Sequence, residues 1–371
     1  MENHQYLLSI DNGTQSVRAM IFNSQGQLLA KSKIDIEPYF SSQNGWAEQY
    51  ADYFWEKLCL ACQTLWRENS IDKQAIAAVS VTTQRATVVT MGKNHQPLRP
   101  AISWLDQRQV DSKPVLGVFE SALMALIRAK PLVDLMHQQS EANWLEQNEP
   151  ELWKQVSKFL LLSGYHNYKL TGEYKDSIAS TVGFVPFDYK TQQWAEKNDW
   201  KWRAMPITRD MLPEVLPAGS KLGKISAAAA IETGIPEGLT LISSGSDKAC
   251  EVLGTGCTDS HTGSLSYGSL ATINIASDKY LEAIPFYPAY PGVVPGTFNV
   301  EMMVQRGYWM VSWFKQEFGL HETQQSAEQK VSPESLFDQL LAEVPAGSDG
   351  LMLQPYWSPS NGDGPETRGA I

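Results

Sequence analysis

The strongest constraint on the fold is a stretch near the N-terminus, residues 6–22, which reads YLLSIDNGTQSVRAMIF. Two short, mostly apolar runs, residues 7–10 and 19–22, flank a segment of turn formers and small polar residues. This pattern predicts a strand, a tight turn and a returning strand, with Gly13 free to adopt a positive φ. Such a turn directs several backbone N–H groups to one point, where they can bind a phosphate.

Side chains around this turn support a phosphate site. Thr14 and Ser16 would add hydroxyl donors. Asp11 precedes the turn, and its carboxylate would repel phosphate oxygens unless a Mg²⁺ ion lay between them. The alternative is an ordinary β-hairpin, and this stretch alone does not decide between the two. The sequence contains no GxxxxGK[ST] motif, so a P-loop is excluded.

The composition of the 371-residue chain is that of a globular protein, with 43% hydrophobic and 19% charged residues. This length predicts two domains. The net charge of −11 argues against a nucleic-acid partner, which needs a basic face. No apolar stretch approaches the roughly 20 residues that cross a bilayer, so we expect no membrane-spanning helix. The first residues show no export signal.

The four cysteines do not form a disulfide framework in a chain of this length. Cys59 and Cys62 form a CxxC motif, but they lie inside a helical pattern with no second pair at zinc spacing. Core packing is therefore the expected role, and a metal or redox role is the alternative. A reducing cytoplasm is the expected compartment.

The order of the expected elements indicates a mixed α/β fold. After the first hairpin, we expect strands at residues 28–36, 76–81 and 86–91, then a mostly helical region at 114–172. The GWAE segment at 45–48 is expected to open a helix. Later elements are a loop at 284–296, a helix at 307–318 and a short buried strand at 350–353.

A second candidate site follows the apolar strand at residues 239–242. The sequence continues SSGSD, which places Asp247 at the carboxyl end of that strand. In open α/β sheets ligands bind at this edge. A helix is expected at 248–256, and a domain boundary near Cys257.

Residues 263–275 have the character of the opening hairpin: a strand, a turn of glycine and hydroxyl residues, and a strand. Two such turns suggest a duplicated module whose halves bind a nucleotide between them, although the similarity could also arise by chance. The final residues, RGAI, follow a Gly/Pro-containing turn region and look like a truncation of a longer chain.

Residues 100–108 present Trp104, Asp106 and Arg108 close together. The plain interpretation is a surface salt bridge beside a half-buried tryptophan. The alternative is a ligand site, and the segment does not decide between them by itself.

Taken in order, these segments make the chain resemble the FGGY family of carbohydrate kinases, within the superfamily of sugar kinases, heat-shock chaperones and actin. The resemblance covers essentially all 371 residues. Its six segments are 11–18 (DNGTQSVR), 45–48 (GWAE), 102–108 (ISWLDQR), 245–256 (GSDKACEVLGTG), 267–269 (YGS) and 350–371. Each is weak singly, but six in the family's order are a specific signal.

The resemblance implies an α/β fold with a ribonuclease H-like (actin-like ATPase) domain and the beginning of a second, similar domain. Residues 1–257 would be the sugar-binding domain, and residues 258–371 the incomplete start of the nucleotide-binding domain. The implied activity is transfer of the γ-phosphoryl group from ATP to a hydroxyl of a sugar or polyol. ATP and Mg²⁺ would be the cofactors.

The resemblance also implies roles for individual residues. Asp247 would be the catalytic general base, and Asp11 would orient the Mg²⁺ ion. The residues implied in sugar binding are Gln84, Arg85, Trp104, Asp106 and Lys248. Those implied in phosphate binding are Gly13, Thr14, Gln15, Ser16, Arg18, Gly268 and Ser269. These roles agree with the chemistry, because phosphoryl transfer needs mainly positioning, charge neutralisation and one base.

Departures from the family leave alternatives open. The family's adenosine-binding segment is absent, so a sugar-binding fragment without kinase activity is the main alternative. An actin-like or chaperone-like ATPase without a sugar is another. Ala86 replaces the acid that glycerol-type kinases carry at this position, which argues against glycerol. The sugar stays unidentified, and a homodimer is left open.

Overall fold

The computed structural model describes residues 5–111, 115–126, 130–267, 271–285, 287–304, 307, 309–354 and 369–370. The chain divides into two compact units, Met1–Ser260 with Ala276–Val300, and His261–Ile275 with Glu301–Ile371. Residues 276–300 therefore return to the first unit, which the sequence did not indicate. The domain limits 1–257 and 258–371 stay a prediction.

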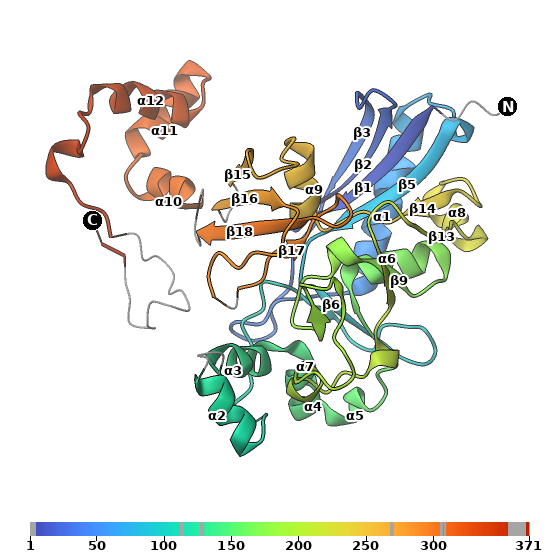
Figure 1. Ribbon diagram of the computed structural model, residues 1–371. Helices are drawn as coiled ribbons and strands as arrows, with labels where there is room; N and C mark the ends of the chain where they lie inside the picture. The colour runs from blue at the N-terminus through green and yellow to red at the C-terminus, as the bar shows by residue number, and fades with distance from the viewer. Residues whose placement is uncertain are drawn as a thin grey trace. The chain divides into compact units, whose positions relative to one another are not determined.

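A mixed sheet of six strands organises the first unit (Figure 1). Its order is β13-β14-β5-β1-β2-β3. The strands are β1 (Tyr6–Asn12), β2 (Ser16–Asn23), β3 (Leu28–Asp35), β5 (Ile76–Thr83), β13 (Lys221–Lys224) and β14 (Thr240–Ile242). β1 pairs in parallel with β5, and β5 with β14, whereas β2 and β13 run antiparallel to their neighbours. The carboxyl ends of β1, β5 and β14 therefore meet at one edge of the sheet.

The strand–turn–strand prediction for residues 6–22 is confirmed. β1 and β2 pair in register from Tyr6 and Asn23 to Asn12 and Val17, and the amide of Gly13 donates to the carbonyl of Ser16 at 3.1 Å. The expected positive φ at Gly13 is wrong. This hydrogen bond continues the strand ladder through Gly13, so the backbone there needs no left-handed conformation.

Three helices pack against the sheet and form the main core (Figure 1). α1 (Ala51–Glu68) contacts β2 and β3, α6 (Leu162–Thr171) contacts β5 and β13, and α8 (Ala227–Thr233) contacts both helices. Cys59 and Cys62 lie buried in this core, which confirms their packing role. Helix α1 begins at Ala51, and the prediction that the GWAE segment opens it is wrong. Glu48 and Gln49 instead form a short strand, β4, which pairs with β7 (Ala101–Ile102) of a second sheet.

A second layer of the first unit consists of a small sheet and short helices. The sheet order is β4-β7-β6-β8, with β6 at Val88–Met91, β7 at Ala101–Ile102 and β8 at Lys158–Leu161. The helices are α2 (Val118–Leu126), α3 (Lys130–Gln139), α4 (Glu141–Asn148), α5 (Pro150–Trp153) and α7 (Lys201–Ala204). The mostly helical character expected for 114–172 is thus confirmed for the described residues. Short strand pairs, β9 (Lys175–Ser177) with β12 (Glu214–Leu216) and β10 (Phe187–Asp188) with β11 (Gln193–Trp194), complete the layer.

The helix expected after β14 is confirmed as α9 (Asp247–Gly254). Ser246 caps its N-terminus by accepting a hydrogen bond from the amide of Ala249. None of the helices in the described ranges has both the length and the apolar character needed to cross a membrane.

Elements of the later part of the chain include β15 (Gly263–Tyr267), which pairs antiparallel with β16 (Ala271–Ser277) as expected. The loop at 284–296 contains a two-residue strand, β17 (Tyr290–Pro291), which pairs with β18 (Phe298–Val304). The helices are α10 (Trp309–Glu317), α11 (Leu320–Gln329) and α12 (Pro333–Glu343). The buried strand expected at 350–353 is wrong, because Leu351, Met352 and Leu353 are exposed and join no strand ladder.

Candidate active site

The carboxyl ends of β1 and β5 and the turn after β14 are joined by side-chain contacts. Asp11, near the end of β1, lies opposite Arg18 on β2 and Thr82 on β5. Arg18 Nη1 donates to Asp11 Oδ2 at 2.6 Å, and Thr82 Oγ1 donates to the carbonyl of Gly245 at 2.7 Å. Three segments that are distant in sequence thus form one edge of the site.

The turn that leads to Asp247 is closely packed. An added Cβ at Gly245 would lie 2.8 Å from Val293 Cγ2 and 3.1 Å from Ala249 Cβ. Only glycine fits there without a shift of these neighbours. Asp247 follows as the first residue of α9 and is half-buried. The sequence prediction that it lies just beyond the carboxyl end of a strand is confirmed.

Opposing charges act on the Asp247 carboxyl group. Burial raises its pKa, and the negative charge of Asp11 raises it further. The positive charge of Arg85 lowers the pKa, as does the hydrogen bond from the Lys248 amide at 2.7 Å. Asp11 and Arg85 therefore both lie within electrostatic reach of Asp247. The net result is a raised pKa, which makes Asp247 a stronger proton acceptor once it is ionised.

Tyrosine side chains surround Arg85, which the sequence did not reveal. The Arg85 guanidinium lies 5.4 Å from the ring centroid of Tyr290. The Tyr290 ring contacts Tyr189 edge-on at 5.4 Å and Tyr287 at 6.2 Å. Burial raises the pKa of Tyr189 to about 12, although the charge of Arg85 opposes this. Tyr287 and Tyr290 come from the segment YPAYPG, for which the sequence predicts only a loop.

Gln84 directly precedes Arg85, and its side chain is buried. Neither its amide oxygen nor its amide nitrogen has a hydrogen-bond partner among the described residues. Its backbone amide donates to the carbonyl of Asn12 at 2.9 Å. A buried amide without partners costs about 1–3 kcal/mol, so a ligand that paired with it would recover part of this energy.

Trp104 contacts the turn of the first hairpin. Its indole Nε1 donates to Thr14 Oγ1 at 3.1 Å. Gln15, next in the turn, is exposed, whereas Ser16 is buried. The structure therefore places a residue implied in sugar binding against one implied in phosphate binding.

Both carboxylate oxygens of Asp106 accept hydrogen bonds from protein donors. Its Oδ2 accepts from the amide of Ala47 at 2.7 Å and from Arg108 Nη2 at 2.6 Å, and its Oδ1 accepts from Arg108 Nε at 2.7 Å. Arg108 also donates to Glu48 at 2.8 Å, and its guanidinium lies 4.0 Å from the Trp46 ring centroid. The side chains of Asp106 and Arg108 are 4% and 3% exposed. This is a buried network, not the surface salt bridge of the plain interpretation, and sugar binding by Asp106 stays a prediction.

Lys248 lies on α9, and its Nζ is 2.7 Å from Glu251 Oε2. Its role in sugar binding also stays a prediction. Gly268 and Ser269 lie outside the described residues.

Asp11 is suited to a Mg²⁺ ion that also binds phosphate oxygens. Its Oδ1, unlike Oδ2, has no hydrogen-bond partner in the part of the chain that the structure describes. No group of three or more histidine, cysteine and acidic side chains in the described ranges could enclose a metal by itself. Mg²⁺ is usually held by one or two carboxylates together with substrate phosphates, so this donor set fits.

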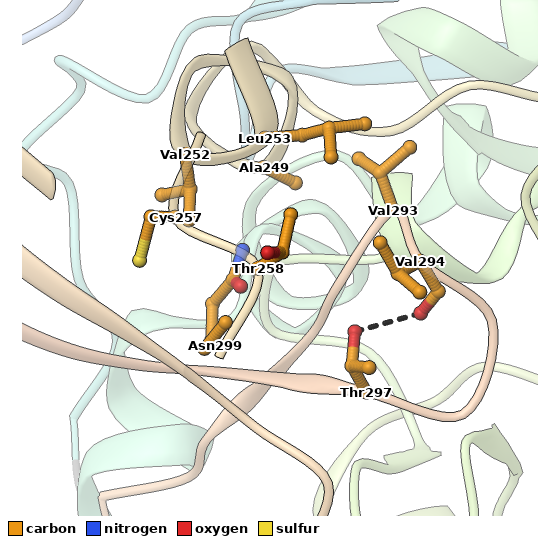
Figure 2. A pocket seen from close by; sticks show the side chains of 10 residues that line it. Ala249, Val252, Leu253, Cys257, Thr258, Val293, Val294, Thr297 and Asn299 are labelled. Atoms are coloured by element: carbon orange, nitrogen blue, oxygen red, sulfur yellow. Dashed lines mark hydrogen bonds between the residues drawn. The ribbon is translucent and has the colours of Figure 1, made fainter. Parts of the chain in front are cut away.

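A small cavity lies beside α9 (Figure 2). It is lined by α9 residues such as Val252 and by Val293 and Val294, and Thr297 Oγ1 donates to the carbonyl of Val294 at 2.7 Å. Its volume of about 10 Å³ holds at most one water molecule. It is therefore a packing defect and not a substrate pocket.

Comparison with known proteins identifies the family. The family model for the N-terminal domain of the FGGY family of carbohydrate kinases matches residues 6–254. The chain belongs to this family. This FGGY-family chain is 28% identical over 355 residues to an uncharacterized sugar kinase of Escherichia coli (strain K12), covering 95% of the chain and 64% of that relative. It is 26% identical over 356 residues to the xylulose kinase of Lactococcus lactis subsp. lactis (strain IL1403), covering 95% of the chain and 67% of that relative. The chain thus spans about two thirds of the length of these relatives.

Solved structures confirm the fold of the FGGY-family chain. It is similar to a ligand-bound xylulose kinase from Lactobacillus acidophilus, with a TM-score of 0.78 and 18% identity, over 98% of this chain and 71% of that one. The likeness to a xylulose kinase from Rhodospirillum rubrum has a TM-score of 0.78 and 22% identity, over 99% and 72% of the two chains. The expected ribonuclease H-like, actin-like ATPase fold is confirmed.

Proposed function

We propose that this protein is an ATP-dependent carbohydrate kinase that phosphorylates a hydroxyl of a sugar or polyol, with Asp247 as general base. The observation that carries the proposal is the cluster of Asp247, Arg85 and Asp11 at the carboxyl ends of three strands. Membership of the FGGY family supports the reaction class.

In the proposed reaction, the ionised Asp247 carboxylate accepts the proton of the substrate hydroxyl. The alcohol oxygen then bonds to the γ-phosphorus, and the bond from that phosphorus to the β–γ bridging oxygen breaks, which leaves ADP. The raised pKa of Asp247 favours proton acceptance, and Arg85 keeps enough of the carboxyl group ionised to act as a base.

In this proposal the turn after β1 binds the phosphates of ATP. Backbone amides of residues 14–16 and the hydroxyl of Thr14 would donate to the phosphate oxygens. Arg18 is paired with Asp11, so it would act partly by orienting that carboxylate. Mg²⁺, where bound by Asp11 Oδ1, would supply positive charge that neutralises the phosphates. Gly268 and Ser269, which lie outside the described residues, stay candidates for phosphate binding.

Substrate binding would involve Gln84, Arg85 and Trp104, with Tyr189, Tyr287 and Tyr290 added from the structure. The unpaired amide of Gln84 offers two N–H donors and a carbonyl acceptor, which matches a polyhydroxylated ligand. The tyrosines fix the Arg85 guanidinium through ring contacts. Glycerol, xylulose and gluconate appear in the names of relatives or structural neighbours, so they belong in the first test panel.

The second candidate function is sugar binding without turnover. It is favoured by the buried side-chain amide of Gln84, which has no hydrogen-bond partner among the described residues and could pair with a sugar whether or not ATP is bound. Both candidates use the same sugar site and differ only in whether ATP is consumed.

One experiment separates these functions. Pentoses, hexoses and polyols are screened with the purified protein in a coupled ADP-release assay, and sugar binding is followed by tryptophan fluorescence. We expect turnover with at least one compound and a loss of more than about a thousandfold for Asp247→Ala. The control Asp35→Ala, which removes an exposed carboxylate paired with Lys33, should keep full activity. Near-full rates for Asp247→Ala would refute the base assignment, and binding without turnover would establish the second candidate.

A further inference from the structure

His166 is a buried histidine of α6 that contacts the phosphate-binding turn. Its side chain is fully buried, and Nε2 lies 2.9 Å from Oδ1 of Asn12, which is also fully buried. Asn12 is the last residue of β1 and lies between Asp11 and Gly13. The contact therefore joins a helix of the core to the start of the turn.

The direction of this hydrogen bond follows from the neighbouring contacts. Asn12 Nδ2 donates to the carbonyl of Gly13 at 3.1 Å, and a reversed amide would place two oxygens against each other there. Oδ1 is therefore the acceptor that faces His166. Burial, together with the positive charge of Lys169, lowers the pKa of His166 to about 3. The imidazole is thus neutral near pH 7 and carries its proton on Nε2.

Packing alone does not account for a histidine at this position. The other ring nitrogen, Nδ1, is buried and has no hydrogen-bond partner among the described residues. An apolar side chain of similar size would avoid this unpaired atom. The His166 ring also contacts the rings of Trp55 and Tyr165, which an apolar ring could do equally well, so the feature that requires an imidazole is the hydrogen bond to Asn12.

Asn12 connects two parts of the site through its backbone. Its carbonyl accepts from the amide of Gln84 at 2.9 Å, and its register partners are Val17 on β2 and Thr83 on β5. The orientation of Asn12 therefore affects both the turn that begins at Gly13 and the Gln84–Arg85 segment.

We propose that His166 is a positioning residue for the phosphate-binding turn and acts by holding Asn12, which in turn holds the carbonyl of Gly13. The inference rests on the proposed function for its catalytic consequence, because the turn matters to turnover only if it binds the phosphates of ATP. The positioning itself can be measured without any activity.

The first test measures hydrogen exchange of the backbone amides in the full chain. His166→Leu should exchange faster than wild type at residues 13–16 and at 84–85, whereas His166→Gln should stay close to wild type because its amide nitrogen can replace Nε2–H. The matched control is His137→Leu, which removes a buried histidine whose Nδ1 lies 3.2 Å from the carbonyl of Ala204 on α7. Unchanged exchange at 13–16 in folded His166→Leu, or an equal change in His137→Leu, would overturn the proposal.

The second test measures kinetics with ATP and whichever sugar wild type accepts. His166→Leu should raise KM for ATP about 2- to 10-fold, the effect of losing one hydrogen bond that acts on binding, and His166→Gln should restore it. The pH profile should not move, because His166 stays neutral over the working range. A shifted profile would contradict the positioning role. If the wild-type protein neither binds nor uses ATP, the proposed function is wrong. The hydrogen-exchange result would still decide whether His166 positions the turn.

Discussion

Replacing Arg108 by methionine should strongly destabilise the first unit. Its guanidinium donates to both oxygens of Asp106 and to Glu48, and lies 4.0 and 4.5 Å from the ring centroids of Trp46 and Trp144. Burial by itself would lower the pKa of Arg108, but the bonds to Asp106 and Glu48 raise it, so the charged form is stabilised in place. The methionine side chain has a similar length but lacks the positive charge and the hydrogen-bond donors of the guanidinium.

The magnitude follows from the carboxylates that remain. Asp106 and Glu48 are 4% and 6% exposed, so neither can be hydrated without local opening. Glu48 keeps its bond to Arg99, whereas Asp106 keeps two backbone amides, those of Ala47 and of residue 108, but loses its cationic partner. Removing one partner of a buried ion pair costs about 3–5 kcal/mol, and we expect Arg108→Met to lower the free energy of unfolding by this amount.

The assay is urea unfolding followed by tryptophan fluorescence and by circular dichroism. The matched control is Arg203→Met, because Arg203 forms a two-bond pair with Glu120 on the surface, and its midpoint should stay near wild type. Adding Asp106→Asn to Arg108→Met should recover part of the loss, because it removes the unpaired charge. If Arg108→Met shifts the unfolding no more than Arg203→Met does, the inference that this buried network stabilises the fold is wrong.

Two further predictions concern pH. Asp247 must be ionised to act as a base, so activity should rise as pH rises through its pKa. Because Arg85 lowers this pKa, Arg85→Leu should move the acidic limb of the kcat/KM profile to higher pH. An acidic limb that did not move would contradict the electrostatic link between Arg85 and Asp247. Burial raises the pKa of Asp176 to about 7, despite hydrogen bonds that lower it, so the folded state binds this proton more tightly than the unfolded state. Stability should therefore fall as pH rises from about 4 to about 7, and Asp176→Asn should reduce this dependence in urea midpoints measured across that window.

The sequence determined the local part of the site. Two short apolar runs and the turn chemistry of 6–22 were sufficient to predict β1, the turn and β2. The apolar run at 239–242, followed by small residues and one acid, was sufficient to predict the position of Asp247. These predictions succeed because strand periodicity and turn composition act between residues close in sequence.

Longer-range chemistry was not visible in the sequence. The segments GWAE and ISWLDQR were recognised separately, but the bond from Arg108 to Glu48 depends on the pairing of β4 with β7. The four-residue apolar run at 350–353 was too short to distinguish a buried strand from an exposed segment, since burial depends on a partner strand.

Tertiary structure alone decided which side chains meet around the site. Tyr290 reaches Arg85, and His166 reaches Asn12, across more than a hundred residues of intervening chain. No local pattern encodes such contacts, because they are set by how β5, α6 and the 276–300 segment pack in the same unit. The sequence thus determined the strands, the turn and the acid of this carbohydrate-kinase family member, and packing determined the charges and hydrogen bonds that act on them.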